Sequence, residues 1–165
     1  LWDHIMKIGK PMGLVPGHTS TIRRIEGGML SYQADMDYTV NPFELGLGRL
    51  VDLEMDADFI GKDALKKIQS EGVKRRQVGV EILCPPLQHP NTSYWPIFID
   101  SNKIGYITSA VYSPRLDKNI ALAIMDADYS AIDTVAEVRS SDGNHSIKVV
   151  QKPFYDPKKK ITSAS

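Results

Sequence analysis

The feature that most constrains the fold of this chain is a change of hydrophobic rhythm at Gly72. Beyond it, Val78, Val80 and Ile82 alternate with polar residues or glycine, and a period of two is typical of a strand with one buried face. Further strand-like segments follow, and Asp142-Gly143 is a hairpin signal between two of them. These segments are residues 97–99, 103–109, 120–125, 134–139 and 146–150. Short strands with frequent turns and no intervening helix predict a small antiparallel β-barrel or sandwich.

The part before Gly72 is predicted to be mixed. An apolar stripe at helical spacing predicts a helix over residues 58–70, and Leu1, Ile5 and Ile8 predict another that ends near Gly9. Short strands are expected over 22–26 and 49–53, and a loop over 13–21. The chain is therefore expected to be an α+β protein, divided into residues 1–72, a barrel at 73–155 and a tail at 156–165. Because a helical rhythm starts at the first residue, we expect a C-terminal fragment of a longer protein.

Composition excludes several classes of function. The 165 residues are 42% hydrophobic and 24% charged, as in an ordinary globular domain. Twenty basic residues balance twenty acidic ones, so no net field favours nucleic acid or an anionic membrane as a partner. A single cysteine, Cys84, excludes a disulfide framework and indicates a reducing, cytoplasmic location. No apolar stretch approaches the length of a membrane span.

Glu26 is the main candidate for binding chemistry. It lies between Ile25 and the pair Gly27-Gly28, and glycines allow a ligand to approach the backbone closely. A carboxylate there can accept two parallel hydrogen bonds from a flat heterocycle with adjacent N–H donors. The alternative interpretation is a solvated turn. Tyr32 and Trp95 lie at loop–strand junctions, where an aromatic ring stacks on a heterocycle or fills a hydrophobic gap.

Other chemistry has little support in the sequence. The four histidines are scattered without a ligand partner at helical spacing, so no metal site is predicted. Gly46-Leu47-Gly48 lacks the third glycine of a dinucleotide fingerprint. Ser109 and Ser113 have no matching histidine and aspartate for a nucleophile. Cys84, between an apolar strand and two prolines, is interpreted as a packed thiol.

An ordered set of motifs, including RIEGGM at 24–29 and NPFELGLG at 41–48, resembles a known family. The other motifs cover residues 13–16, 58–65, 107–109, 113–114 and 118–123. Together they resemble the C-terminal half of the tetrahydrofolate-dependent aminomethyltransferases, the T-proteins of glycine cleavage. Within that family, residues 17–24, 29–32 and 90–96 look most like members that demethylate dimethylsulfoniopropionate. The resemblance implies a cloverleaf around a folate channel, in which residues 1–72 end an αβ folate-binding region.

The resemblance also implies roles for particular residues. Glu26 would hold the pterin ring of tetrahydrofolate, and Tyr32 and Trp95 would pack against folate or a sulfonium group. Candidates for binding a carboxylate of either molecule, the folate cofactor or the substrate, are Arg49, Arg76 and Arg115, each of which is otherwise a solvated surface arginine; Arg76 is counted with the cofactor-binding residues.

The activity implied first is methyl transfer from dimethylsulfoniopropionate, giving 5-methyltetrahydrofolate and methylmercaptopropionate. The alternatives are the aminomethyltransferase reaction and a non-catalytic folate-binding relative. The expected partners are a small-molecule substrate and the N-terminal half of the same protein, and a homodimer is also allowed.

Overall fold

The computed structural model describes residues 1–17, 20–158 and 160. The first part of the chain is built from short helices and turns. These are α1 (Trp2–Gly9), η1 (Lys10–Met12), α2 (Thr21–Glu26), η2 (Gly48–Leu50) and α3 (Lys62–Glu71). Strands dominate the second part, with one short 3₁₀ turn. They are β1 (Arg75–Leu83), β2 (Trp95–Ile99), β3 (Asn102–Ser113), β4 (Lys118–Asp126), η3 (Ala127–Tyr129), β5 (Val135–Ser140) and β6 (Gly143–Val150).

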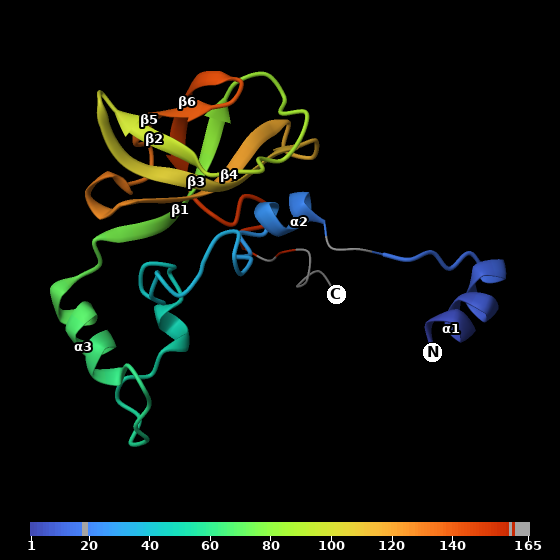
Figure 1. The fold of residues 1–165 in the computed structure, drawn as a ribbon, viewed down its shortest axis with the longest axis horizontal. Coiled ribbons are helices and arrows are strands. Elements are labelled where there is room, and N and C mark those ends of the chain that lie inside the picture. Colours follow the sequence, from blue (N-terminus) through green and yellow to red (C-terminus); the bar gives the residue numbers. More distant parts are fainter. Residues whose placement is uncertain (18–19, 159, 161–165) are drawn as a thin grey trace.

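Across the described residues, the strands form a closed antiparallel barrel in the order β1-β4-β3-β2-β5-β6. Strand β1 closes it by pairing with β4 on one side and β6 on the other. Figure 1 shows the barrel as one compact body, with α2 against it and the segment after β6 passing close to α2. The predicted antiparallel barrel is therefore confirmed, and so is the turn that joins β5 to β6 at Asp142-Gly143.

The barrel interior contains the alternating residues that predicted it. Val78, Val80 and Ile82 of β1 face Ile107 of β3 and Ile147 of β6 in one buried hydrophobic cluster. Strand β4 is buried continuously from 119 to 125, whereas continuous burial in β1 covers only residues 77–80. Continuous burial means that the outer face of β4 is also covered, and this is where the two parts of the chain meet.

A second hydrophobic cluster lies outside the barrel, beneath α2. Ile25 of α2 contacts Val111 of β3 together with Ile120 and Leu122 of β4, and all of these are buried. Half-buried Ile22, Leu30, Leu116 and Phe154 surround them. Ile22 and Ile25 are three positions apart, so a helix places both on the face toward the sheet. The cluster joins α2 to the outer surface of β3 and β4.

Two predicted strands are wrong. Residues 22–26 lie in helix α2, whose N-cap Ser20 accepts a hydrogen bond from the Arg23 N–H at 3.3 Å. A five-residue segment is too short to separate helical from strand periodicity, and the capping serine decided the outcome. Residues 49–53 form part of the 3₁₀ turn η2 and then an irregular segment, in which Leu53 alone is deeply buried.

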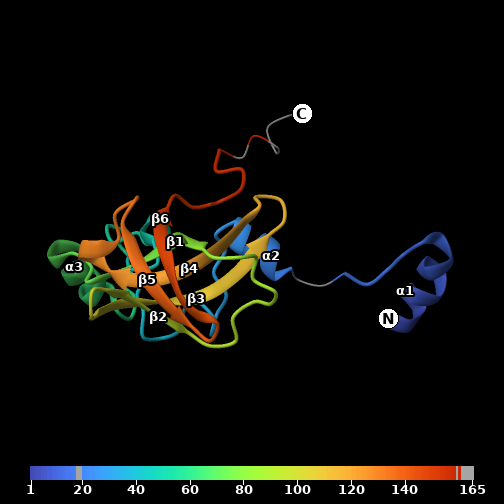
Figure 2. The same ribbon diagram turned by 90° about the horizontal axis from the view of Figure 1, so that it is seen from above.

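Both predicted helices are present with shifted bounds. Helix α1 ends at Gly9 as expected, whereas α3 begins at Lys62 instead of Asp58, because Gly61 has a left-handed φ of 93° just before it. Neither helix has a buried residue, and Figure 2 shows α1 apart from the barrel. The predicted tail is described only at 156–158 and at 160, and residues 18–19 of the 17–24 motif also lie outside the described residues.

Candidate functional site

Glu26 is buried at the C-terminal end of α2, with only 4% of its surface exposed. Its carboxylate oxygen Oε1 accepts a hydrogen bond from the Ser113 hydroxyl at 2.6 Å, and Ser113 is the last residue of β3. The other oxygen, Oε2, lies 3.8 Å from the guanidinium of Arg115. Burying a carboxylate without partners is costly, so this arrangement satisfies the charge with one short bond and one nearby cation.

The backbone of Glu26 joins a third segment to the same point. Its carbonyl oxygen accepts hydrogen bonds from the N–H groups of Phe154 at 2.9 Å and Tyr155 at 3.0 Å. The Arg115 guanidinium lies 4.2 Å from the centre of the Tyr155 ring, in a cation–π contact. Helix α2, the end of β3 and the segment after β6 therefore meet at Glu26. The carboxylate keeps free lone pairs, since each oxygen accepts up to two hydrogen bonds.

A second buried carboxylate, Asp35, holds the turn that follows α2. It is 1% exposed and accepts hydrogen bonds from the Thr108 hydroxyl at 2.7 Å and the Ser31 N–H at 2.9 Å. Arg24 pairs with Asp35 and also donates to the Ser109 hydroxyl at 2.9 Å. Because Thr108 and Ser109 belong to β3, this network fixes the turn after Glu26 against the barrel.

A groove of about 890 Å³ runs beside this turn. We call it the Gly28–Lys152 groove. Its lining residues are Gly27, Gly28, Met29, Leu30, Met36, Leu45, Gly46, Leu47, Arg49, Lys152, Pro153 and Pro157. Burial lowers the pKa of Lys152 to about 8, and the negative charge of Asp35 opposes that shift. Glu26 is adjacent in sequence to the lining, although its own carboxylate points to the barrel.

The predicted site residues are only partly brought together. Arg115 contacts Glu26, and Arg49 lines the same groove as Gly27 and Gly28. Trp95 is 7% exposed and belongs to the barrel core, as the gap-filling interpretation expected.

Tyr32 and Arg76 are not joined to Glu26. Tyr32 is 63% exposed on the surface of the turn, and Arg76 is exposed on β1. Sequence reasoning missed two residues of the site. Ser113 was considered only as a nucleophile, and no local pattern marks Lys152.

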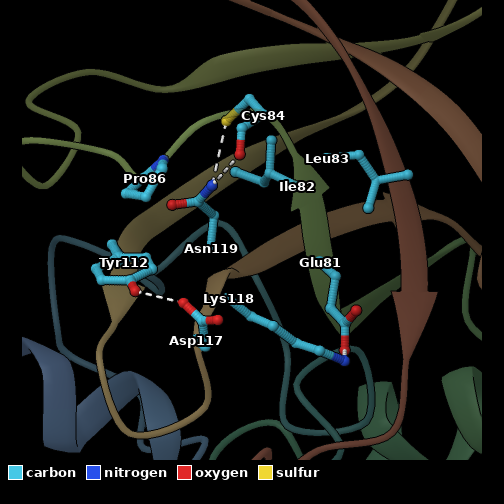
Figure 3. Close-up of a pocket in the computed structure, with 9 residues that line it drawn as sticks. All are labelled: Glu81, Ile82, Leu83, Cys84, Pro86, Tyr112, Asp117, Lys118 and Asn119. Atoms are coloured by element: carbon cyan, nitrogen blue, oxygen red, sulfur yellow. Dashed lines mark hydrogen bonds and ion pairs between the residues drawn. The ribbon is translucent and has the colours of Figure 1, made fainter.

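A separate hollow of about 280 Å³ lies at one end of the barrel, around Cys84 (Figure 3). The Asn119 side-chain amide donates to the Cys84 sulfur at 3.3 Å and to its carbonyl oxygen at 2.8 Å. Burial raises the pKa of the Cys84 thiol, which lowers its reactivity. This placement supports the packed-thiol interpretation.

The described residues contain no cluster of three metal-ligating side chains. Their helices include none that is long and apolar enough to cross a membrane.

These features define an α+β protein whose antiparallel barrel carries a helical layer and a buried carboxylate at their junction. The chain matches family models in both of its parts. The glycine cleavage T-protein C-terminal barrel domain matches residues 75–156, and the GCVT N-terminal domain matches residues 1–55. This chain therefore belongs to the glycine cleavage T-protein family, and it carries part of the N-terminal domain together with the C-terminal barrel.

Individual relatives agree with this assignment. An aminomethyltransferase of Bacillus pumilus is 36% identical over 158 residues, which make up 94% of this chain and 42% of that protein. One from Clostridium botulinum is 37% identical over 163 residues, covering 97% of this chain and 43% of the relative. The chain thus spans less than half the length of these curated relatives.

A solved structure extends the likeness to the fold. The glycine cleavage system aminomethyltransferase T from Bartonella henselae matches 82% of this chain and 38% of its own, with a TM-score of 0.73. At 21% identity, that match shows the fold alone.

Proposed function

We propose that this chain is the folate-binding C-terminal part of a tetrahydrofolate-dependent one-carbon transferase. The observation that carries the proposal is Glu26, a buried carboxylate beside two glycines and a groove. Aminomethyl transfer is the reaction with the most support, because the curated relatives are named aminomethyltransferases. In that reaction the carbon of an aminomethyl group would leave the sulfur of a lipoylated carrier and join tetrahydrofolate, giving methylene-tetrahydrofolate, ammonia and the carrier with its lipoyl group as the reduced dithiol.

The residues present fit a folate. The pterin ring presents an N–H and an amino group side by side, and a carboxylate such as Glu26 can accept both. Ser113 occupies only one lone pair of Oε1, at 2.6 Å, so acceptor capacity remains on both oxygens. The groove beside Gly27 and Gly28 has apolar walls suited to the flat remainder of the molecule. When bound, tetrahydrofolate would supply the nitrogen that accepts the one-carbon unit, and the chain would position it.

A second candidate is demethylation of dimethylsulfoniopropionate. The segment that resembles the demethylating members lines a polar hollow of about 300 Å³ with Thr21, Arg24 and Ser109. The Tyr94 ring from that segment stacks on Tyr106 at 5.0 Å between centroids, and its hydroxyl donates to the Gln33 carbonyl at 3.3 Å. In this reaction one sulfur–methyl bond breaks as a folate nitrogen–methyl bond forms. The products would be 5-methyltetrahydrofolate and methylmercaptopropionate.

Binding of tetrahydrofolate tests both candidates, and we expect Glu26→Gln to weaken it. The glutamine keeps an oxygen for Ser113 but replaces the second oxygen with an N–H donor, which opposes the pterin donors. Losing a charge-assisted hydrogen bond costs roughly 1.5–3 kcal/mol, about ten- to a hundred-fold in affinity. Calorimetry on the full-length protein would measure the change. Unchanged affinity in a folded Glu26→Gln variant would contradict the pterin role.

Analysis of the reaction products would identify the donor of the one-carbon group. The full-length protein with tetrahydrofolate would be given either an aminomethylated lipoyl carrier or dimethylsulfoniopropionate. Methylene-tetrahydrofolate from the first supports the aminomethyltransferase, and 5-methyltetrahydrofolate from the second supports the demethylase. Folate binding without either product would favour the non-catalytic relative. A homodimer and a cytoplasmic location, both expected from the sequence, stay predictions.

A further inference from the structure

The turn between β5 and β6 contains a chemically reactive pair of residues. Asp142 is followed by Gly143, and no other aspartate or asparagine of the sequence precedes a glycine. Ser141 and Asp142 connect the strands, and Gly143, the first residue of β6, pairs with Ser140, the last residue of β5. Asp142 and Gly143 are both exposed. The pair therefore lies open to water at the tip of a hairpin.

The fold requires glycine at position 143. Its φ is 123°, a conformation that residues with a Cβ rarely adopt. The space beside it is also open, because a Cβ added there would have no other atom within 4 Å. A glycine nitrogen is the backbone nitrogen least hindered by its own residue, since no Cβ shields it. The turn thus combines an exposed carboxyl group with an accessible nitrogen in the next residue.

The side chain of Asp142 is only weakly held. Among the described residues, its one hydrogen bond comes from the neighbouring Ser141 hydroxyl at 3.1 Å, and no basic side chain pairs with it. That bond draws electron density from the carboxyl group, and it ties the side chain to no other strand. Asp133, another exposed aspartate, is instead paired with Lys148 at 2.7 Å. The Asp142 carboxyl group is therefore free to turn toward the Gly143 nitrogen.

We propose that Asp142 is a site of spontaneous isomerisation to isoaspartate. The Gly143 backbone nitrogen attacks the side-chain carboxyl carbon of Asp142 and forms a new C–N bond. The nitrogen's proton and one carboxyl oxygen leave as water, which closes a five-membered succinimide. Water then opens the ring: attack at the original main-chain carbonyl gives isoaspartate, and attack at the other carbonyl regenerates aspartate. The reaction needs no reagent besides water and leaves the mass of the chain unchanged.

Isomerisation would alter the hairpin and mark it for repair. Isoaspartate carries the main chain through its Cβ, so one extra methylene group enters the turn beside the Ser140–Gly143 and Arg139–Asn144 pairs. Because a turn fixes the register of its strands, we expect the ends of β5 and β6 to loosen. The exposed product is a substrate for the methyltransferases that esterify isoaspartyl groups with S-adenosylmethionine. This inference does not depend on the proposed function.

The experiment ages the full-length protein for several weeks at neutral pH and physiological temperature. Isoaspartate is then located in a digest by fragmentation mass spectrometry, and Asp142 should contain severalfold more of it than Asp100. Asp100 is the internal control, because it is exposed in the turn between β2 and β3 but is followed by Ser101. A purified isoaspartyl methyltransferase should methylate the aged protein. In Asp142→Glu, whose side chain would have to close a slower six-membered ring, methylation should fall to the level of fresh protein.

Three results would overturn the inference. The first is an isoaspartate content at Asp142 no higher than at Asp100. The second is isomerisation that occurs only in urea-unfolded protein, because the folded hairpin would then protect the pair. The third is equal methylation of the aged wild type and Asp142→Glu, which would place the reactive residue elsewhere. None of these results bears on Glu26 or on folate binding.

Discussion

At the scale of single residues, the two buried carboxylates have different surroundings. Asp35 accepts hydrogen bonds from Ser31 and Thr108 and pairs with Arg24. Glu26 has one short bond, from Ser113, and a cation 3.8 Å away. The first arrangement, with three donors, is typical of a structural carboxylate whose acceptor capacity is mostly used. The second leaves capacity for a ligand, and this difference supports Glu26 as the binding residue.

Removing the Ser113 hydroxyl is expected to destabilise the protein. Ser113→Ala leaves the buried Glu26 carboxylate without its closest donor, and a hydrogen bond to a charged group contributes about 1.5–3 kcal/mol. Urea unfolding of the purified protein would measure this loss. Ser101→Ala, at an exposed position, serves as a control and should change stability by less than about 0.5 kcal/mol. Equal effects of the two substitutions would argue against the Glu26–Ser113 bond.

Lys152 is expected to make stability rise with pH in the alkaline range. Its pKa is about 8 in the folded protein against 10.5 ordinarily, so between these values the unfolded chain binds more protons. Stability therefore increases from about pH 8 toward 10.5 as the buried amine becomes neutral. Asp35, which favours the charged form, reduces the effect. Melting temperatures across this range should rise less in Lys152→Met, and identical profiles would contradict the assignment.

At the scale of elements, β3 and β4 are pressed together where Gly105 lies. A Cβ at this position would approach the Ile124 carbonyl oxygen to 2.3 Å and the Met125 Cα to 2.8 Å. Both of those atoms belong to the backbone of β4, so neither can move away alone. The close approach of the two strands therefore requires glycine here.

Gly105→Ala is accordingly expected to cost about 1–3 kcal/mol or more, the range for overpacking a well-packed interior. Gly17→Ala is the control, because no atom lies within 4 Å of an added Cβ and its φ is not left-handed. Thermal unfolding of both variants would measure the difference. A melting temperature of Gly105→Ala equal to that of the wild type would show that the strands separate more easily than their packing indicates.

At the scale of the whole molecule, α2 and the barrel share one hydrophobic cluster. Ile25 is fully buried against Val111, Ile120 and Leu122, which lie on the outside of the barrel. Hydrogen bonds from β3 to Glu26, to Asp35 and to Arg24 join the same two parts of the chain. We therefore expect α2 and the barrel to unfold together.

Ile25→Ala tests this coupling. A cavity in a buried cluster costs about 2–5 kcal/mol, whereas Ile60→Ala, at a fully exposed position, should cost less than about 0.5 kcal/mol. Urea unfolding followed by tryptophan fluorescence, in a Trp2→Phe background that removes the exposed tryptophan of α1, would report on Trp95 in the barrel core. A fluorescence transition that does not shift in Ile25→Ala would mean that α2 detaches independently of the barrel.

The barrel could be predicted because its signal is local. Alternation in β1 reports a buried face within a few residues, and the Asp142-Gly143 turn marks where β5 ends and β6 begins. Residues 22–26 of helix α2 could not be distinguished from a strand by their sequence, since five residues are too few to show either the helical or the strand periodicity. Its helical state depends on Ser20 at the N-cap and on the sheet beneath Ile22 and Ile25.

By itself, the sequence determined the antiparallel barrel, the α+β class and the choice of Glu26 as the candidate carboxylate. Those conclusions depend on spacing and on motif order, which are properties of the chain. Only the tertiary structure decided that the Glu26 carboxylate accepts a hydrogen bond from the Ser113 hydroxyl, 87 positions away in the sequence. It also decided that Lys152 lies beside Gly28, while Trp95 fills the barrel. The physical reason is that contacts between distant residues follow from how strands and helices pack, and local spacing carries no record of that packing.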